Sequence, residues 1–444
     1  MPLRKTRILV VCLLWSLCVG YYFFGLLLPA AHLGAVARGQ AGGYEYGNDF
    51  YQIWVTTKEL LTHRVDPYSP EMQREIETGL YGRPLDRSSK RDAIVPYRGY
   101  SYPVQANLLL APLGLMSFSA VQILLSLVLP LCVAASVIGW SSACGLHFSP
   151  YKLASMSVIA LGTCPVLEGL YALQPTLLVA ALVAGSLALL RKHQLAWGGI
   201  VLSLGSIKPH LIGLLALWLM LWAISDWSRR KAFLISFVLA SGIQLLVTQL
   251  WVPGWWLQWW NVLPLYRRVN SPPLAQLVLG NVAGSMAAAV WLLLALYVAW
   301  RWRGRPADSS KFFLASSFML AVTVILASSS VAVYDQLFLL PAILWVWSER
   351  RSVLRANWPV RLASLLLAGA FVWPWLIATL LTLTSPLLPW SRSYAAVLLP
   401  LATAASFPLI LLGLLTLLLW REIRGSRLHG PQEALQPVPV SQEP

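Results

Sequence analysis

The chain has 444 residues, of which 58% are hydrophobic and only 11% are charged, and its mean hydropathy is +0.66. A water-soluble domain of this size does not carry so large an apolar fraction, so the composition indicates a polytopic membrane protein. The formal net charge of +16 does not indicate a nucleic-acid-binding protein, because the basic residues lie in short clusters between apolar runs.

These basic clusters predict the orientation of the chain, because short cytoplasmic loops carry an excess of Lys and Arg. The segment 31–102, in contrast, has nine basic and nine acidic residues and is neutral, as a translocated loop can be. We therefore expect a multi-pass protein of the cytoplasmic (inner) membrane, with residues 31–102 on its outer face. The loops expected in the cytoplasm hold Arg4-Lys5-Arg7, Arg191-Lys192, Arg229-Arg230-Lys231, Arg301 to Lys311, Arg350 to Arg361 and Arg421 to Arg427.

The first predicted helix covers roughly 8–28, and the long outer loop 31–102 follows it. Within this loop, apolar residues from Phe50 to Leu61 recur at helical spacing and predict an amphipathic helix on the membrane surface. A second short helix is expected at 70–79. Residues 102–116 are apolar but too short to span and contain two prolines, so they predict a re-entrant or interfacial segment.

The later spans complete an all-α bundle of about twelve transmembrane helices. A tryptophan-rich outer loop is expected at 251–279, and its aromatic residues fit either the interfacial belt or a substrate entrance. Residues 1–420 form a single integral-membrane domain, followed by a disordered cytoplasmic tail at 421–444. The remaining spans are expected at 119–140, 153–172, 176–190, 195–207, 209–225, 232–250, 280–300, 312–328, 335–348, 361–382 and 395–420.

With this topology, unusual polar residues gather at the outer ends of the spans. Glu168 and Asp335 are the acidic residues expected at membrane depth, where ionisable groups are costly and are functional candidates. Asp49 lies in the long outer loop and is a candidate general base for an acceptor hydroxyl. The alternative is that Asn48-Asp49 caps the amphipathic helix, and the two roles are compatible.

Other candidates fit the binding of a phosphate or a sugar. Lys208 and His210 flank Pro209 and could hold a lipid phosphate, although Lys208 could instead snorkel to the headgroups. Arg98, Arg267, Arg268 and Arg392 could bind phosphate or serve as interfacial anchors. Gln174 could bind a sugar hydroxyl or satisfy backbone groups freed by Pro175, and Tyr334-Asp335 could bind substrate or cap a helix.

Motifs for nucleotide, metal and disulfide chemistry are missing from the sequence. It has no Gly-rich phosphate loop, no HExxH and no CxxC pair, and its five cysteines lie in or beside apolar spans. We therefore expect no cofactor, no metal and no nucleic-acid partner.

Several short segments, taken in order, resemble the polyprenol-phosphate-mannose-dependent mannosyltransferases of glycosyltransferase family 87, within the GT-C membrane superfamily. The chain departs from the family pattern at Tyr102-Pro103-Val104, where the family usually has Tyr-Pro-Pro, and at Leu173-Gln174-Pro175-Thr176, where it usually has Gly-Gln-X-Asn or a similar run. The segments that carry the resemblance are Asp49-Phe50, Asp66-Pro67-Tyr68, Tyr100 to Pro103, Ala111-Pro112-Leu113, Leu173 to Thr176, Gly205 to Pro209, Ser328 to Ser330, and Tyr334 to Leu337.

The resemblance implies an inverting transfer that does not use a nucleotide donor. It implies that Asp49 is the catalytic base and that Lys208 contacts the phosphate of a polyprenyl-phosphate sugar. The acceptor is then a glycan or glycolipid on the outer face. A competing hypothesis is a secondary transporter or flippase of a lipid-linked or anionic substrate, although no internal repeat of the kind common in transporters is visible.

Overall fold

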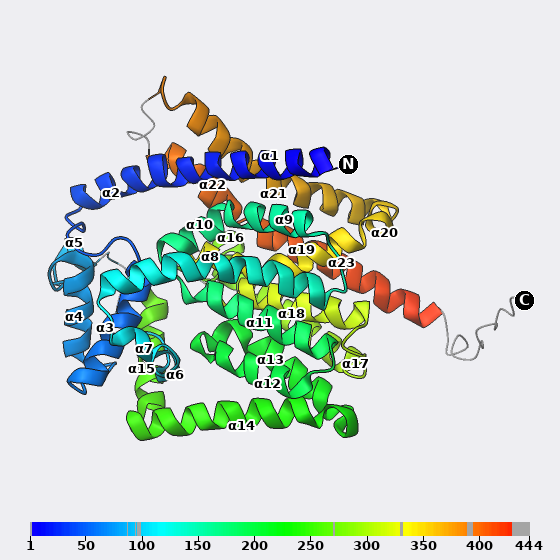
Figure 1. Cartoon of the computed structure of the whole chain (residues 1–444), viewed down its shortest axis with the longest axis horizontal. Helices are drawn as coiled ribbons and strands as arrows, with labels where there is room; N and C mark the ends of the chain where they lie inside the picture. The colour runs from blue at the N-terminus through cyan, green and yellow to red at the C-terminus, as the bar shows by residue number, and fades with distance from the viewer. Residues whose placement is uncertain are drawn as a thin grey trace, which may run out of the picture.

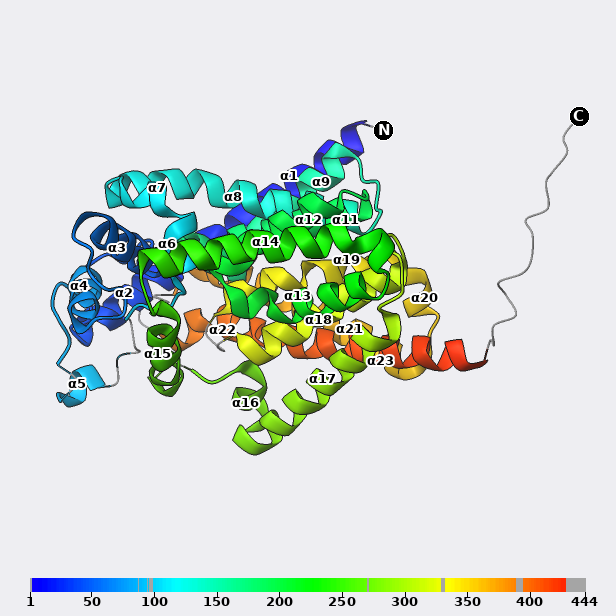
Figure 2. The ribbon, with the colours of Figure 1, turned by 90° about the horizontal axis from the view of Figure 1, so that it is seen from below.

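The computed structural model describes residues 2–86, 88–93, 95, 99–269, 271–328, 332–388 and 394–428, and within these ranges it contains helices but no β-strand. The all-α membrane architecture predicted from composition is therefore confirmed. The start of α1 and the end of α23 lie at one end of the longest axis, and α3 to α7 and α15 gather at the opposite end (Figures 1 and 2).

The first span is longer than predicted. The α-helix α1 (Pro2–Tyr21), the π-helical turn η1 (Tyr22–Leu27) and α2 (Leu28–Ala37) follow one another without a break. The predicted helix end at residue 28 is wrong by nine residues, because Pro29 occupies the start of α2, where proline is tolerated. The outer loop accordingly begins after Ala37 instead of at residue 31.

The two helices predicted inside the outer loop are both present. The amphipathic segment forms α3 (Asn48–Thr62), and the short helix forms α4 (Pro70–Tyr81), which is capped by the Ser69 hydroxyl. A four-residue turn, α5 (Lys90–Ala93), follows. The segment predicted to be re-entrant or interfacial folds as two short helices, α6 (Val104–Leu109) and α7 (Ala111–Gly114), and both pack against α3.

The membrane-spanning helices divide into three kinds within the described residues. Seven are long and apolar enough to cross a bilayer, and one further pair, α9 and α10, is bent by 70°. Four shorter apolar helices occupy the remaining predicted spans. The central elements are α8 (Phe118–Ala143), α9 (Pro150–Leu161), α10 (Cys164–Tyr171), α11 (Pro175–Arg191), α12 (Leu195–Ser203), η2 (Leu204–Ile207), α13 (Pro209–Ile224) and α14 (Trp227–Trp251).

The tryptophan-rich segment 251–279 is helical and not an irregular loop. It contains α15 (Trp255–Val269) and α16 (Leu274–Leu279). Trp255 is buried against Val252 and Leu60, whereas Trp256 and Trp260 are more than half exposed. One face of α15 therefore packs on the outer loop, and the other presents aromatic rings outward, as an interfacial helix does.

The C-terminal third completes the bundle. The helix α18 is buried on nearly all sides, and it packs against α13, α17, α19 and α23. These elements are α17 (Asn281–Trp302), α18 (Ser310–Ala327), η3 (Val333–Leu339), α19 (Leu340–Ser348), α20 (Arg350–Leu354), α21 (Trp358–Thr384), α22 (Tyr394–Ala404) and α23 (Phe407–Leu428). Most residues of the predicted tail, 429–444, lie outside the described ranges.

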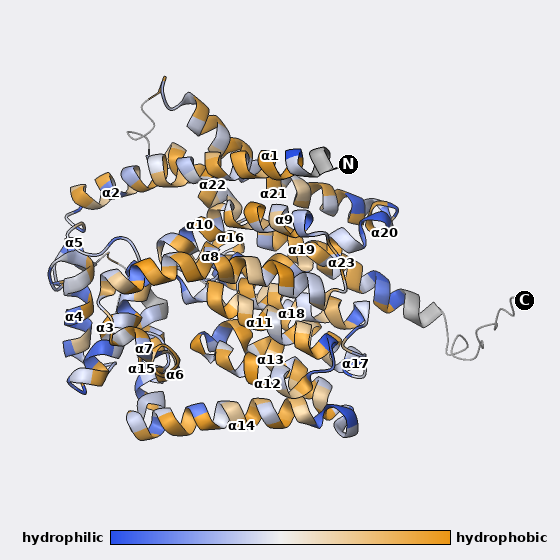
Figure 3. Cartoon of the chain, in the orientation of Figure 1, coloured by the Kyte–Doolittle hydropathy of each residue, from blue (hydrophilic) through white to orange (hydrophobic). Residues whose placement is uncertain are grey.

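Hydropathy follows the long axis of the molecule. Apolar residues dominate the middle of the bundle, and hydrophilic residues gather where α23 ends and on α3 to α5 (Figure 3). The elements that carry the basic clusters, among them α20, lie at the end of the molecule where α23 ends. We refer to this end as the basic end. This distribution fits a bilayer around the middle, and the positive-inside rule predicts that the basic end faces the cytoplasm.

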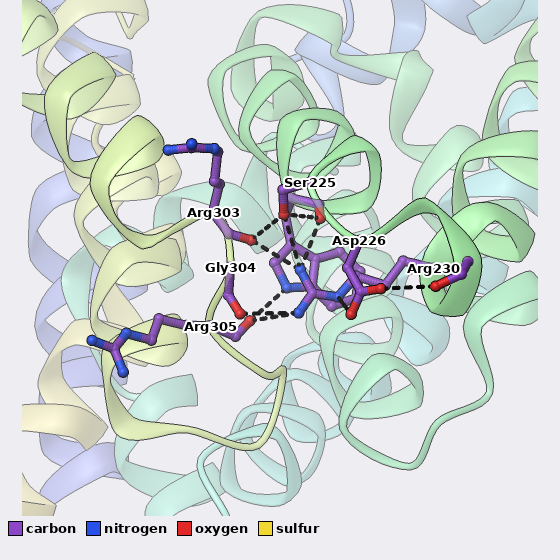
Figure 4. Close-up of polar contacts among 8 residues, drawn as sticks. Ser225, Asp226, Arg230, Arg303, Gly304 and Arg305 are labelled. Carbon is purple, nitrogen blue, oxygen red and sulfur yellow. Dashed lines mark hydrogen bonds and ion pairs between the residues drawn. The ribbon is translucent and has the colours of Figure 1, made fainter. Parts of the chain in front are cut away.

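A buried arginine fixes the loops of the basic end. The guanidinium of Arg230 donates to the backbone carbonyls of Trp222 and Arg303 at 2.9 Å, and it also reaches the carbonyls of Gly304 and Arg305 (Figure 4). The planar, five-donor geometry of arginine allows one side chain to satisfy several carbonyls at once. Arg230 therefore ties the α13–α14 turn to the loop between α17 and α18.

Candidate functional site

The start of α3 determines where Asp49 lies. Gly47 occupies the N-cap position with φ of +75°, and its N–H donates to the carbonyl of Tyr171 at 2.8 Å. The N–H of Phe50 donates to the carbonyl of Ala172, so the first turn of α3 is docked on the end of α10. Asp49 sits inside this first turn, where the helix dipole favours a negative charge. The expectation that Asn48-Asp49 caps the helix is wrong, because both residues belong to it.

The carboxylate of Asp49 is bonded to the residue that opens α11. Nε2 of Gln174 donates to Oδ2 of Asp49, and Oε1 of Gln174 accepts a hydrogen bond of 2.8 Å from Nζ of Lys208. Gln174 is 1% exposed and Lys208 is 5% exposed. The alternative in which Lys208 snorkels to the headgroups is therefore wrong, and the side chain of Gln174 binds side chains and not the backbone around Pro175.

Lys208 is held on its other side by a hydroxyl and a second carboxylate. Its Nζ donates to Oγ1 of Thr176 at 2.6 Å, and Thr176 donates in turn to Oδ1 of Asp335 at 2.8 Å. Nζ of Lys208 lies 3.9 Å from the same carboxylate oxygen. Thr176 and Asp335 are also buried. We refer to Asp49, Gln174, Lys208, Thr176 and Asp335 as the polar chain.

Two tyrosine rings border the polar chain. The hydroxyl of Tyr334 lies 3.4 Å from Oδ2 of Asp49, and Nζ of Lys208 is 5.0 Å from the centre of the Tyr334 ring. The ring of Tyr102 lies 5.9 Å from the same ammonium. Aromatic faces at this distance attract a cation, so the rings stabilise the charge of Lys208.

The motif Asp66-Pro67-Tyr68 supports the segment that carries Tyr102. The Tyr68 hydroxyl donates to the Tyr102 carbonyl at 2.8 Å, and Asp66 accepts from the Tyr68 N–H and from Gln258 of α15. Burial and the neighbouring Asp66 carboxylate raise the pKa of the Tyr68 hydroxyl, which keeps it protonated and able to donate. Trp259 of α15 donates to the carbonyl of Ser101 at 2.8 Å. These contacts join the middle and the end of the outer loop to each other and to α15, beside the polar chain.

The backbone at residue 173 keeps a conformation that favours glycine. Leu173 has φ of +51°, in the left-handed region, although its side chain is fully buried. Glycine adopts this conformation without strain, so Leu173 holds the turn at the cost of the strain of its β-carbon. The turn directs the next residue, Gln174, toward Asp49.

Glu168 places a buried carboxyl oxygen near the polar chain. Glu168 lies in α10, close enough to Asp49 and Asp335 to interact with them electrostatically. Its Oε2 is buried and has no hydrogen bond within the described part of the chain. It is therefore an acceptor that a hydroxyl could use. No group of three His, Cys, Asp or Glu residues with metal-binding geometry occurs among the described residues.

The structure brings together five of the nine predicted site residues, Asp49, Gln174, Lys208, Tyr334 and Asp335, from four separate segments of the chain. His210 lies in the first turn of α13 and is exposed. Arg98 and Arg392 lie outside the described residues, as do the side chains of Arg267 and Arg268, whose backbone belongs to α15. Asp335 bonds Thr176 and does not cap η3, whose N-cap residue is Ala332.

Thr176 and Tyr102 belong to the site but were not predicted as site residues. Both occur in segments that the sequence singled out, and Thr176 is two residues after Gln174 at the proline that opens α11. The spacing alone gives no reason to place a threonine hydroxyl between a lysine and an aspartate that are distant in sequence. Only the helix packing reveals this bridge.

Comparison with known proteins identifies the class to which this fold and site belong. Residues 100–330, more than half of the chain, match the profile of glycosyltransferase family 87. The chain belongs to this family and is a membrane glycosyltransferase of the GT-C type. No curated protein and no solved structure matches the chain.

Proposed function

We propose that this glycosyltransferase moves a hexose from a polyprenyl-phosphate sugar to a glycan or glycolipid acceptor on the outer face of the cytoplasmic membrane, with inversion at the anomeric carbon. Mannose is the sugar that the resemblance implies. The single observation that carries the proposal is the buried polar chain that ends on Asp49 at the start of α3. It joins the Asp49 carboxylate, which precedes the region that matches the family, to Lys208, which lies inside that region.

In this proposal Asp49 is the general base. Its carboxylate takes the proton of the acceptor hydroxyl while the hydroxyl oxygen forms a bond to the anomeric carbon. The bond from that carbon to the phosphate oxygen breaks, and the polyprenyl phosphate leaves with the electron pair. The hydroxyl of Tyr334, 3.4 Å from Oδ2 of Asp49, limits the directions from which the acceptor can approach.

Lys208 is the residue that we assign to the phosphate. It forms two hydrogen bonds, to Gln174 and Thr176, and its ammonium carries three donors. Its distance of 3.9 Å to Asp335 is too long for a hydrogen bond, so one N–H is available for an anionic leaving group. A fixed positive charge at this place stabilises the charge that develops on the phosphate.

The remaining predicted contacts complete the proposal. His210, Arg98, Arg267 and Arg268 are proposed to meet the phosphate or the headgroup region, and Oε2 of Glu168 is an acceptor available to a sugar hydroxyl. The positive-inside distribution of the basic clusters supports an active site on the outer face. No cofactor is part of the proposed reaction.

The test compares wild type with Asp49→Asn, purified into nanodiscs and supplied with radiolabelled polyprenyl-phosphate mannose. We expect the variant to fold, to bind the donor and to lose turnover by about 10³-fold or more, because the acceptor proton has no base. Asp308→Asn, at the basic end, is the matched control and should keep wild-type turnover.

An Asp49→Asn variant with near-normal turnover would refute the assignment of the base. If wild type consumes neither the mannose donor nor another polyprenyl-phosphate sugar, the proposed donor class is wrong. Movement of an intact lipid-linked sugar across the bilayer by both proteins would instead support the flippase hypothesis.

A further inference from the structure

The bridging amide of Gln174 has a fixed orientation. A lysine ammonium can only donate hydrogen bonds, and an ionised carboxylate can only accept them. Gln174 lies between the two, with Oε1 on Nζ of Lys208 and Nε2 on Oδ2 of Asp49. Reversing the amide would break both bonds, so Lys208 determines which group Gln174 presents to Asp49.

The hydrogen bonds between Lys208 and Asp335 also have fixed donors and acceptors. The Thr176 hydroxyl accepts from Lys208 at 2.6 Å, so its single proton is available to Asp335, at 2.8 Å. Asp335 is 2% exposed and supplies a negative charge 3.9 Å from the ammonium. Every donor and acceptor from Asp335 to Asp49 is therefore assigned without ambiguity.

The members of the polar chain come from elements that are far apart in the sequence. Asp49 belongs to α3, Gln174 and Thr176 belong to the start of α11, Lys208 lies between η2 and α13, and Asp335 lies in η3. A buried hydrogen-bonded network resists rotation of its members, because breaking any of its bonds leaves polar groups unpaired in a low dielectric. The network thus couples the position of α3 to that of η3.

We infer that Thr176 and Asp335 are positioning residues, which act through Lys208 and Gln174 to hold the Asp49 carboxylate in place. This inference rests on the proposed role of Asp49 as the base. The sequence predicted Asp335 as a substrate contact. Here Asp335 instead supports the base. A displacement of about 1 Å at a reacting group costs about 10²-fold in rate, so the effect should be measurable.

The test is Thr176→Val, which keeps the shape of the side chain and removes the hydroxyl that joins Lys208 to Asp335. We expect kcat to fall by about 10- to 100-fold while the KM for the donor stays within about two-fold of wild type. Thr176→Ser keeps the hydroxyl and should restore most of the lost kcat. Asp335→Asn, which keeps an acceptor but removes the charge, should lower kcat in the same way.

Thr248→Val is the matched control. Thr248 is also fully buried, but its hydroxyl bonds only the carbonyls of Gln244 and Leu245 within α14. It should lose some stability and keep wild-type kcat. If Thr176→Val behaves like Thr248→Val, or if it raises KM and leaves kcat unchanged, the positioning role is refuted.

A second readout separates this inference from the proposed function. Thermal unfolding of Asp49→Ala, Thr176→Val and the double variant forms a double-mutant cycle that needs no substrate. The Asp49 and Thr176 side chains are not hydrogen-bonded to each other, so non-additive shifts in Tm would show that their interaction passes through Lys208 and Gln174. Strictly additive shifts would refute the inference, even if wild type consumed no donor. Coupled shifts without turnover would refute only the proposed donor class.

Discussion

Glu168 has an unusual environment for a carboxyl group. Its Oε2 is buried without a hydrogen bond from any described residue, and Asp49 and Asp335 lie nearby. A buried polar group without a partner costs about 1–3 kcal/mol, and nearby carboxylates add to that cost. Binding sites commonly retain such unfavourable groups because a ligand satisfies them.

We therefore predict that Glu168→Gln raises the stability of the free protein. The free energy of unfolding should increase by about 0.5–2 kcal/mol, because the substitution removes an acid next to two others. Thermal unfolding in detergent, followed by tryptophan fluorescence, measures this change. Glu75→Gln, at an exposed position of α4, is the control and should shift stability by less than about 0.5 kcal/mol. A loss of stability in Glu168→Gln would contradict this reading of the site.

At the residue scale, the sequence identified the charged members of the polar chain better than its threonine. Asp49, Lys208 and Asp335 stand out because charged groups are rare and costly in an apolar chain. Thr176 does not stand out, because threonine is common in membrane helices and its hydroxyl usually bonds its own backbone. The assignment of partners also required the structure, since the sequence left open whether Lys208 holds a phosphate or snorkels to the headgroups, and the structure surrounds it with polar side chains.

At the scale of elements, the junction between α3 and α10 is the part of the site where an added side-chain atom is tolerated least. A β-carbon on Gly47 would lie 2.7 Å from Cδ1 of Leu173, and Gly47 has φ of +75°. Both residues adopt left-handed conformations, so they form two facing turns that direct Asp49 and Gln174 toward each other.

We predict that Gly47→Ala lowers turnover by about 10-fold or more, because strain and the clash with Leu173 displace the first turn of α3. Backbone strain alone should cost about 1–2 kcal/mol. Gly369→Ala, where no atom lies within 4 Å of the added carbon, is the control and should keep both stability and turnover. Adding Leu173→Ala to Gly47→Ala should recover part of the lost turnover by removing the clash. Wild-type kinetics in Gly47→Ala would contradict the prediction.

The sequence predicted the existence of most elements but not their breaks. The span predicted at 153–172 is bent by 70° between α9 and α10, where Gly162 approaches Ser16 of α1 too closely for a side chain. The segment 251–279 was predicted as a loop because its tryptophans and prolines obscure the helical period. Its helix α15 is stabilised by contacts to Asp66 and Ser101, which are distant in sequence.

At the scale of the whole molecule, the distribution of basic residues predicts that the basic end faces the cytoplasm and that the outer loop faces the opposite side of the membrane. The loop that carries Arg305 belongs to the basic end, and Ser88 belongs to the outer loop near α5. Both side chains are exposed, whereas the native cysteines are buried or half-buried. In intact cells, a membrane-impermeant maleimide should label Ser88→Cys and not Arg305→Cys, and both should react after the membrane is opened. Labelling of Arg305→Cys in intact cells would mean that the orientation is reversed.

The first span also has a consequence for where the two substrates meet. Its 32 residues from Thr6 to Ala37 extend about 48 Å at 1.5 Å per residue, whereas the hydrocarbon core is about 30 Å thick. Even a tilt of about 40° would leave a projection of about 37 Å along the bilayer normal, so the end of this helix stands above the lipid tails. In the proposed orientation this end leads toward α3, so we expect Asp49 to lie near the height of the headgroups. In the proposed reaction, a sugar attached to a lipid phosphate lies at that height, so the donor reacts without leaving its leaflet while the acceptor arrives from water.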